Sequence, residues 1–234
     1  MSLALHDAAT GTLFGVALNY TGLLKQRLAE FEQPPYKQAP VKPVLFIKTP
    51  NTRNAHGAEV VQPTGERLQP GPALGVVIGK DASRVSAAEA LNYVAGYTIA
   101  NDLTNRDQIW RRDDMKAMGT DWIAGKSSPT YLPVGPYLVP ADFIPNPQDL
   151  RLTLKLNSEV KQDENTSDMI FDVARQIEYL SSLVQLYPGD IICTGSPAGN
   201  GAHYNRFLRH GDVMESSITG LGTQRNQCQQ EGAK

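Results

Sequence analysis

Cysteine is nearly missing from this sequence, which has two among 234 residues, Cys193 in an apolar run and Cys228 near the polar C-terminal end. Two thiols placed this way are too few for the disulfide framework that stabilises small secreted domains. The first residues also lack the positively charged start and the long apolar core of a secretory signal. We therefore expect a protein of a reducing compartment, the cytoplasm.

Long apolar stretches and an excess of positive charge are missing as well. No apolar run reaches the roughly 20 residues that a membrane-spanning helix needs. The formal net charge is -2 and the isoelectric point lies near 6.1, so the chain offers no basic field for nucleic acid. The expected partners are small molecules and other protein subunits, with no nucleic acid and no membrane.

Histidine is scarce, and its four residues lie near the N-terminus, in predicted loops and in a predicted turn: His6, His56, His203 and His210. Such positions favour the protein surface over a catalytic site. His203 lies beside a glycine-rich segment, which makes it the strongest candidate of the four for a functional role.

What the sequence does contain is a series of short apolar runs separated by glycine, proline and asparagine. With 41% hydrophobic and 20% charged residues, the chain is long enough for a substantial core, and we predict a single domain over residues 1–234. The runs predict a β-rich α+β fold in which a rolled mixed sheet encloses a cleft. The predicted strands cover residues 12–18, 43–48, 74–78, 93–100, 130–139, 150–156, 191–194, 207–215 and 217–222, with a turn at 210–212.

Helical signals are fewer. The best one runs from Ile170 to Leu183, where apolar side chains recur at helical spacing. A shorter pattern covers residues 22–31. Ser86, followed three residues later by Glu89, predicts a capped helix over residues 87–93.

Polar side chains gather just after the predicted strand 93–100, at Asn101, Asp102, Arg106 and Asp107. A carboxylate is a hard oxygen ligand for metal ions, and a guanidinium is a planar fork that binds a carboxylate through two hydrogen bonds. Asp102 and Arg106 could therefore hold a metal or a carboxylate substrate between them. The alternative is a salt-bridged loop that closes the strand and binds no ligand.

Two other segments could contribute to a cleft. Residues 109–125 are highly charged and contain two tryptophans, which indicates either a solvated surface loop or a lid. Residues 195–201 form a glycine-rich loop after a strand, and its backbone N–H groups and hydroxyls could cradle a carboxylate.

Several motifs occur in order along the chain: Gly75-Val-Val-Ile-Gly-Lys80, the stretch from Tyr93 to Gln108 with Asn101-Asp102, Gly125-Lys126, residues 162–172, and Pro188-Gly-Asp-Ile-Ile-Cys-Thr-Gly-Ser-Pro-Ala-Gly-Asn-Gly201. Together they resemble the fumarylacetoacetate hydrolase family, from Thr12 to Asn226. The resemblance implies the rolled mixed sheet of that family's C-terminal domain, and it implies a homodimer.

The resemblance also implies roles for particular residues. Arg106 and Lys126 match cationic family positions that hold the substrate's oxygens, and the loop from Thr194 matches the one that binds its acid group. The implied substrate-binding residues are Asn19, Tyr20, Arg106, Lys126, Thr194, Gly195 and Ser196, and the implied catalytic residues are Asp102, Arg106 and Lys126. An arginine fork with an ammonium group suits a dicarboxylate or a 2-oxo acid.

The sequence departs from the family pattern at two places. Of the three carboxylates that bind a metal in active members, Asp102 is present, whereas the two glutamate positions carry Gly71 and Ala73. The family implies Mg²⁺ or Mn²⁺, but a divalent ion wants about six oxygen ligands, so we predict weak binding here. The family's catalytic histidine and its glutamate partner would fall near Leu23 and Gln26, and no histidine lies in that segment.

Three functions follow as hypotheses. The first is an enzyme of aromatic catabolism that acts on small 2-oxo or 2-hydroxy-dienoic dicarboxylates, by tautomerisation with decarboxylation or by C–C bond hydrolysis. This hypothesis draws on a likeness to the N-terminal half, or equivalent subunit, of the isomerase/decarboxylase of homoprotocatechuate breakdown. The second is an acylpyruvate-type C–C hydrolase. The third is a non-catalytic paralogue that binds such an acid or pairs with an active, paralogous subunit.

Overall fold

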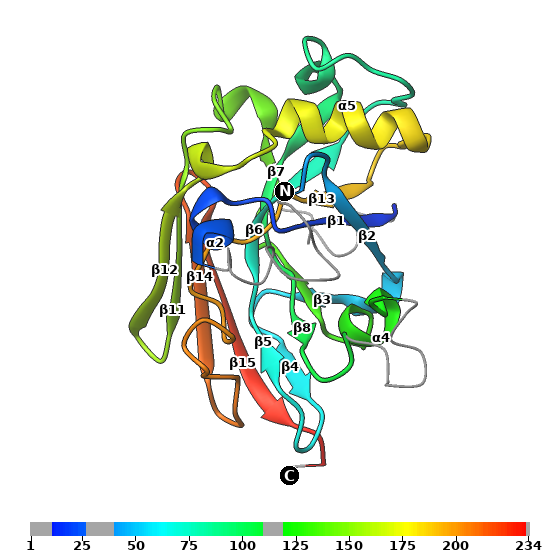
Figure 1. Cartoon of the computed structure of the whole chain (residues 1–234). Helices are drawn as coiled ribbons and strands as arrows, with labels where there is room; N and C mark the ends of the chain where they lie inside the picture. Colours follow the sequence, from blue (N-terminus) through cyan, green and yellow to red (C-terminus); the bar gives the residue numbers. More distant parts are fainter. Residues whose placement is uncertain (1–10, 27–39, 110–118, 233–234) are drawn as a thin grey trace.

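The computed structural model describes residues 11–26, 40–109 and 119–232, and its larger sheet has eight strands (Figure 1). Seven of them follow the order β2-β1-β13-β6-β7-β9-β3, and β10 pairs with β7. The β1–β13 and β3–β9 pairs are parallel and the others are antiparallel. The bounds are β1 (Leu13–Ala17), β2 (Val44–Lys48), β3 (Arg53–Ala55), β6 (Pro72–Ile78), β7 (Val94–Asn101), β9 (Leu132–Val134), β10 (Val139–Pro140) and β13 (Ile191–Cys193).

A second sheet has five strands in the order β12-β11-β14-β15-β4, and a short pair, β5–β8, lies apart from both. The long strands of the five-stranded sheet run along one side of the molecule in Figure 1. The bounds are β4 (Glu59–Gln62), β5 (Leu68–Gln69), β8 (Thr104–Asn105), β11 (Arg151–Leu156), β12 (Glu159–Asn165), β14 (Val213–Ile218) and β15 (Gly222–Gln230). The predicted α+β class, a curled mixed sheet with few helices, is confirmed.

The long predicted helix is also confirmed, as α5 (Val173–Leu183), which crosses one end of the molecule (Figure 1). It begins at Asp172, whose Oδ1 accepts a hydrogen bond of 2.7 Å from the backbone N–H of Arg175, an N-cap that satisfies one of the unpaired donors of the first turn. Its apolar stripe, including Ile177 and Leu180, is buried in the main core against the larger sheet. Core packing thus accounts for the middle of the predicted pattern, whereas Ile170 precedes the helix and Leu183, at its end, is exposed.

The smaller helices are α2 (Thr21–Gln26) and α4 (Trp122–Lys126), with single 3-10 turns at Pro50–Thr52, Ala90–Tyr93, Ala141–Phe143 and Thr166–Asp168. Of the helix predicted over 22–31, the part from 27 onward lies outside the described residues, as does most of the predicted lid or surface loop at 109–125. No described helix is long and apolar enough to cross a membrane.

The capped helix predicted over residues 87–93 is wrong. Residues 87–89 form a turn, a 3-10 helix follows at Ala90–Tyr93, and the residue before it makes no side-chain cap. The backbone N–H of Ala87 instead donates to the carboxylate of Glu178 on α5, at 3.0 Å. A segment this short makes few helical hydrogen bonds of its own, so contacts with the neighbouring helix decide its conformation.

Two strand predictions need correction. The strand predicted over 130–139 is two strands, β9 and β10, because Pro136 has no N–H to donate to a ladder and Gly135 has a φ of 107°. The last pair runs later than predicted, as β14 and β15 joined by a turn at 219–221, although the 210–212 segment is a turn. Cys228 therefore lies in a strand and is buried, rather than in a polar tail.

The end of β7 is tied to the start of β6, and this tie positions the polar residues that follow. The backbone N–H of Asp102 donates to the carbonyl of Gly71 at 2.9 Å, and the Gly71 N–H donates to Oδ1 of Asn101 at 2.9 Å. Side chains along β6 alternate between two apolar clusters, one beneath α5 and one that contains Ala73. The chain after Asn101 is thereby held at one edge of the core.

Candidate active site

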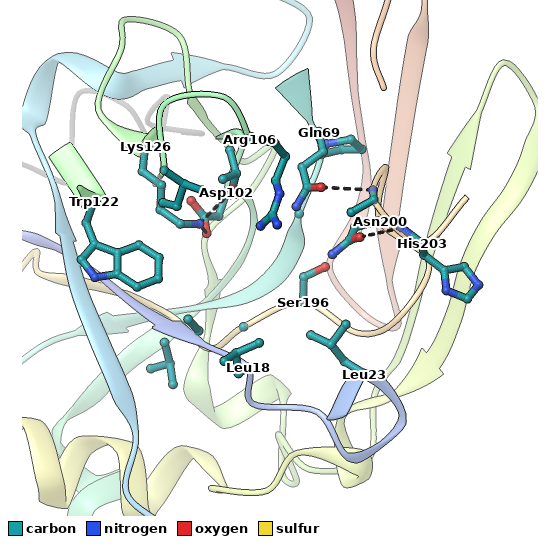
Figure 2. A pocket seen from close by; sticks show the side chains of 18 of the residues that line it. Leu18, Leu23, Gln69, Asp102, Arg106, Trp122, Lys126, Ser196, Asn200 and His203 are labelled. Atoms are coloured by element: carbon teal, nitrogen blue, oxygen red, sulfur yellow. Dashed lines mark hydrogen bonds and ion pairs between the residues drawn. The ribbon is translucent and has the colours of Figure 1, made fainter. Parts of the chain in front are cut away.

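A cavity of about 320 Å³ opens at this edge (Figure 2). It is bounded by the end of β1, by α2, by the junction of β6 and β7, by α4 and by the loop after β13. The lining residues used below are Leu23, Gln26, Gln69, Gly71, Asp102, Thr104, Arg106, Trp122, Lys126, Gly195, Ser196, Asn200 and His203.

One wall of the cavity contains a carboxylate held between two lysines. Nζ of Lys48 lies 2.8 Å from Oδ1 of Asp102, and Nζ of Lys126 lies 2.5 Å from Oδ2. Lys48 also donates to the carbonyl of Leu103 at 3.2 Å, and Lys126 donates to Oγ1 of Thr104 at 2.9 Å. Both carboxylate oxygens therefore have an ammonium partner.

Local periodicity explains why the two lysines meet. Lys48 ends β2 two residues after Phe46, so both side chains point to the same buried face of that strand. Lys126 lies one turn after Trp122 on α4, so these two share a helix face. The Phe46 and Trp122 rings stack at 5.2 Å, and Nζ of Lys126 lies 4.3 Å from the Phe46 centroid, within the range of a cation–π contact.

Burial and charge shift the protonation of this cluster. Burial lowers the pKa of Lys48 to about 8; attraction to Asp102 opposes this shift, and repulsion from Lys126 adds to it. Burial alone would raise the pKa of Asp102, but Lys126 and Lys48 outweigh it and hold that pKa below its ordinary value. When all three groups are ionised, the net charge of the cluster is +1.

Arg106 reaches the same cavity from the loop beyond β7. Its backbone N–H donates to the carbonyl of Arg67 at 2.9 Å, and its side chain points toward the middle of the cavity in Figure 2. Its neighbour Asp107 is exposed and pairs with Arg67, with Nη2 of Arg67 2.6 Å from Oδ1. The guanidinium of Arg106 and the ammonium of Lys126 thus line one cavity.

The opposite wall comes from the glycine-rich loop. Ser196 lies there, and its hydroxyl accepts a hydrogen bond of 3.1 Å from Nε2 of Gln162 on β12. Gly195 has a φ of 101°, and a Cβ on it would lie 3.0 Å from both Asn19 and the carbonyl of Val16, so the loop requires glycine here. The predicted cradle therefore contributes Gly195 and Ser196 to the cavity.

Three of the predicted substrate-binding residues do not line the cavity. Asn19 is buried, and its side-chain amide donates to the carbonyls of Phe171 and Thr194 at 3.0 and 2.8 Å. The hydroxyl of Thr194 donates to the carbonyl of Leu74 at 3.0 Å. Tyr20 is fully buried, and burial raises the pKa of its hydroxyl. In this structure Asn19 and Thr194 tie segments together beneath the site.

Four polar residues of the site were not predicted from the sequence: Lys48, Gln69, Thr104 and Asn200. The signal for Lys48 was present: a lysine in phase with Phe46 in the apolar strand Val44–Lys48 must be buried with a partner or end at the surface. The other three gave no such signal. They lie in short strands or loops, where the sequence does not show which side chains point toward the cavity. Gln69 accepts a hydrogen bond from the backbone N–H of Ala202 at 3.2 Å.

Comparison with known proteins identifies the relatives of this chain. Residues 12–229 match the family of fumarylacetoacetate hydrolase C-terminal domains. The chain belongs to the fumarylacetoacetate hydrolase family.

Family relatives include several enzymes. The chain is 39% identical over 221 residues to 2,4-didehydro-3-deoxy-L-rhamnonate hydrolase of Sphingomonas sp. (strain SKA58), covering 93% of this chain and 73% of the relative. It is 36% identical over 223 residues to the 4-hydroxyphenylacetate degradation bifunctional isomerase/decarboxylase of Salmonella dublin, covering 94% of this chain but 47% of that protein. Among solved structures, fumarylpyruvate hydrolase from Pseudomonas aeruginosa in complex with Mn²⁺ and pyruvate matches with a TM-score of 0.80 and 26% identity, covering 94% and 90% of the two chains.

The residues present do not fit the family's divalent cation. Asp102 has an ammonium group on each oxygen, and Ala73 is fully buried in an apolar cluster. A Cβ at Gly71 would lie 2.5 Å from the carbonyl oxygen of Asp102, so a longer side chain has no room there without a backbone shift. Among the described residues, no three His, Cys, Asp or Glu side chains are grouped to hold a metal.

The family's catalytic histidine and glutamate have no substitutes at their positions. Leu23 and Gln26 line the cavity, as those positions should, but neither side chain titrates. His203 lines the cavity at its exposed rim, where its ring makes an edge contact with Tyr204 at 4.4 Å, and in Figure 2 it points away from Asp102. Of the described residues that line the cavity, His203 is thus the one histidine, and it lies at the rim.

Proposed function

We propose that this chain is an enzyme of aromatic catabolism that acts on small 2-oxo or 2-hydroxy-dienoic dicarboxylates, by tautomerisation with decarboxylation. The observation that supports this most directly is the cavity lined by both Arg106 and Lys126, with Asp102 held beneath them. A guanidinium fork binds a carboxylate through two hydrogen bonds, and an ammonium group attracts a second anionic oxygen. The cavity of about 320 Å³ is of a size that takes a small diacid.

The arrangement suits decarboxylation because that reaction needs an electron sink. Loss of carbon dioxide breaks a C–C bond and leaves the bonding electron pair on the remaining fragment as an enolate. Positive groups fixed beside the enolate oxygen stabilise it, and keto–enol tautomerisation passes through the same species. We assign this role to Lys126 and the binding of a carboxylate to Arg106, and the cluster around Asp102 keeps Lys126 in place.

The second candidate is an acylpyruvate-type C–C hydrolase. The hydrolases among the relatives support it. Hydrolysis, however, needs a base to activate water, and Leu23 and Gln26 occupy the positions where the family carries its histidine and glutamate. The cavity thus favours decarboxylation, which needs no base to activate water, over hydrolysis.

The third candidate is a non-catalytic paralogue that binds a diacid or pairs with an active subunit. Support comes from the same substitutions, at Leu23, Gln26, Gly71 and Ala73, which remove both the base and two metal ligands. A homodimer and a place in the cytoplasm also remain proposals. Light scattering on the purified chain tests the first of these.

The decisive experiment is a set of assays with oxaloacetate, an acylpyruvate and a muconate-type diacid. Release of carbon dioxide or exchange between keto and enol forms supports the proposed enzyme, whereas cleavage to two acids supports the hydrolase. Binding without turnover supports the paralogue, and no binding of any diacid overturns all three. The variant Arg106→Ala should lose binding, and Arg67→Ala is its matched control because Arg67 pairs with Asp107 at the surface.

A further inference from the structure

The Asp102 cluster has one more positive charge than its carboxylate needs. Lys126 alone would neutralise Asp102, and a neutral pair would attract an anion weakly. Lys48 is fully buried, does not line the cavity, and adds a second ammonium group 2.8 Å from the same carboxylate. Its presence leaves the cluster with a net charge of +1.

The cluster is also the place where the family pattern puts a cation. Asp102 matches the family's metal-binding aspartate, and Gly71, which matches one of its glutamates, lies directly against the backbone of Asp102. A cation placed against Asp102 would meet two ammonium groups at the oxygens it would use. The charge that a metal would supply is thus already supplied by side chains of this chain.

Lys126 is the member of the cluster whose ammonium group can contact a ligand directly. Its hydrogen bonds to Asp102 and Thr104 use two of the three N–H donors of an ammonium group, and the residue lines the cavity. Arg106 lines the same cavity, so an anion there would meet two cationic groups. Lys48 would act from behind Asp102, through charge and not through contact.

We propose that Lys48 and Lys126 take the place of the divalent cation, so that the cavity binds the carboxylate and 2-oxo group of its ligand without a metal. The inference rests on the proposed function, since it concerns the same diacid in the same cavity. Lys126 contacts the ligand, and Lys48 is a positioning residue that holds Asp102 and maintains the net positive charge. No glutamate at 71 or 73 is then required.

The test on the unaltered protein uses oxalate, a planar dianion that resembles the enolate of a 2-oxo acid. Calorimetric titrations are run with EDTA and, separately, with added Mg²⁺, allowing for the Mg²⁺ that oxalate binds in solution. The expected affinities agree within about twofold between the two conditions. Binding that needs Mg²⁺ would overturn this inference and leave the proposed function standing, whereas no binding in either condition would overturn both.

The test of Lys48 uses Lys48→Met, which keeps the side chain's length and removes its charge. Oxalate affinity should fall at least about tenfold, and the dependence of affinity on salt concentration should weaken with it. The matched control is Lys155→Met, at an exposed position on β11, which should change neither. Lys48→Arg, which keeps the charge, should restore the salt dependence; a Lys48→Met protein that binds oxalate as tightly as the unaltered chain would contradict the proposal.

Discussion

Asp102 and Asp107 lie five residues apart, on either side of β8, and each pairs with basic side chains, but their surroundings differ. The Asp102 side chain is 15% exposed and is bound by Lys48 and Lys126. Asp107 pairs with Arg67 at the surface, where the two side chains are 31% and 56% exposed. Water screens the outer pair, whereas the inner cluster acts at short range with little solvent. An ion pair of the same kind can therefore form part of a ligand site when it is buried, and contribute little to stability when it is exposed.

Among variants of these two carboxylates, Asp102→Asn should have the largest effect on stability. The change leaves two buried ammonium groups without a carboxylate, and removing one partner of a buried ionic cluster costs about 3–5 kcal/mol. Chemical denaturation at neutral pH should show a loss of that size in the free energy of unfolding. A loss below about 1 kcal/mol would mean that the cluster is solvated like the surface pair.

Arg106→Ala tests the cavity and not the fold. Because the guanidinium is expected to hold a ligand carboxylate through charge-assisted hydrogen bonds, dicarboxylate affinity should fall on the order of 2 kcal/mol. The melting temperature should change little. A large drop in melting temperature with unchanged affinity would show that Arg106 belongs to a salt-bridged loop without a ligand, the alternative left open by the sequence.

A pH titration of dicarboxylate affinity tests the charge of the buried cluster separately from that of the surface pair. As the pH rises from about 7 to about 9, Lys48 loses its proton and the net charge of the cluster falls from +1 to zero, so affinity should fall by up to about tenfold. The charged or titratable groups that face Lys48 are Asp102, Lys126 and Cys193. Asp102 stays ionised over this window, and burial raises the pKa of Cys193 to about 12, so it stays a thiol.

The control for this titration is the Lys48→Met variant, in which Lys126 is the remaining lysine of the cluster. Its affinity should change much less over the same window. An equal fall in both proteins would assign the effect to Lys126 and remove Lys48 from the explanation.

The smallest expected effect is that of Asp107→Asn. Hydrogen bonds from Arg67 hold the pKa of Asp107 below its ordinary value, but both side chains are largely solvated. Stability should change by less than about 1 kcal/mol, and diacid affinity should be nearly unchanged. Denaturation and titration of this variant beside Asp102→Asn give the direct comparison of the two carboxylates.

The regular parts of this fold were the predictable ones. The stripe of α5 and the apolar strands that became β1, β2, β6, β7, β11 and β13 carry their own periodicity, which local sequence reveals. The segment after Ser86 was misjudged because other groups hold its backbone. Glu178, far along the chain, accepts a hydrogen bond from the Ala87 N–H, and the Glu89 N–H, which a Ser86 side-chain cap would bind, donates to the Ser86 carbonyl. The break between β9 and β10 has a local cause instead, since Pro136 has no N–H for a ladder, and the single strand predicted over 130–139 overlooked it.

The predictable part of the site is the part whose residues lie in the family motifs. Five of the predicted residues line one cavity: Asp102, Arg106, Lys126, Gly195 and Ser196. The family resemblance also grouped Asn19, Tyr20 and Thr194 with them, but these three side chains are buried and do not line the cavity. Lys48 was missed because its partner is 54 residues away, and pairing across that distance follows from the sheet order.

Gly71 bears on how a site of this kind changes over generations. A mutation that placed a carboxylate at position 71 would push a Cβ to within 2.5 Å of the carbonyl oxygen of Asp102. That single change would disturb the backbone without creating a metal site, because both carboxylate oxygens of Asp102 already bind lysines. A metal-binding form of this site therefore lies several simultaneous mutations away, in the Gly71 and Asp102 backbone and at both lysines.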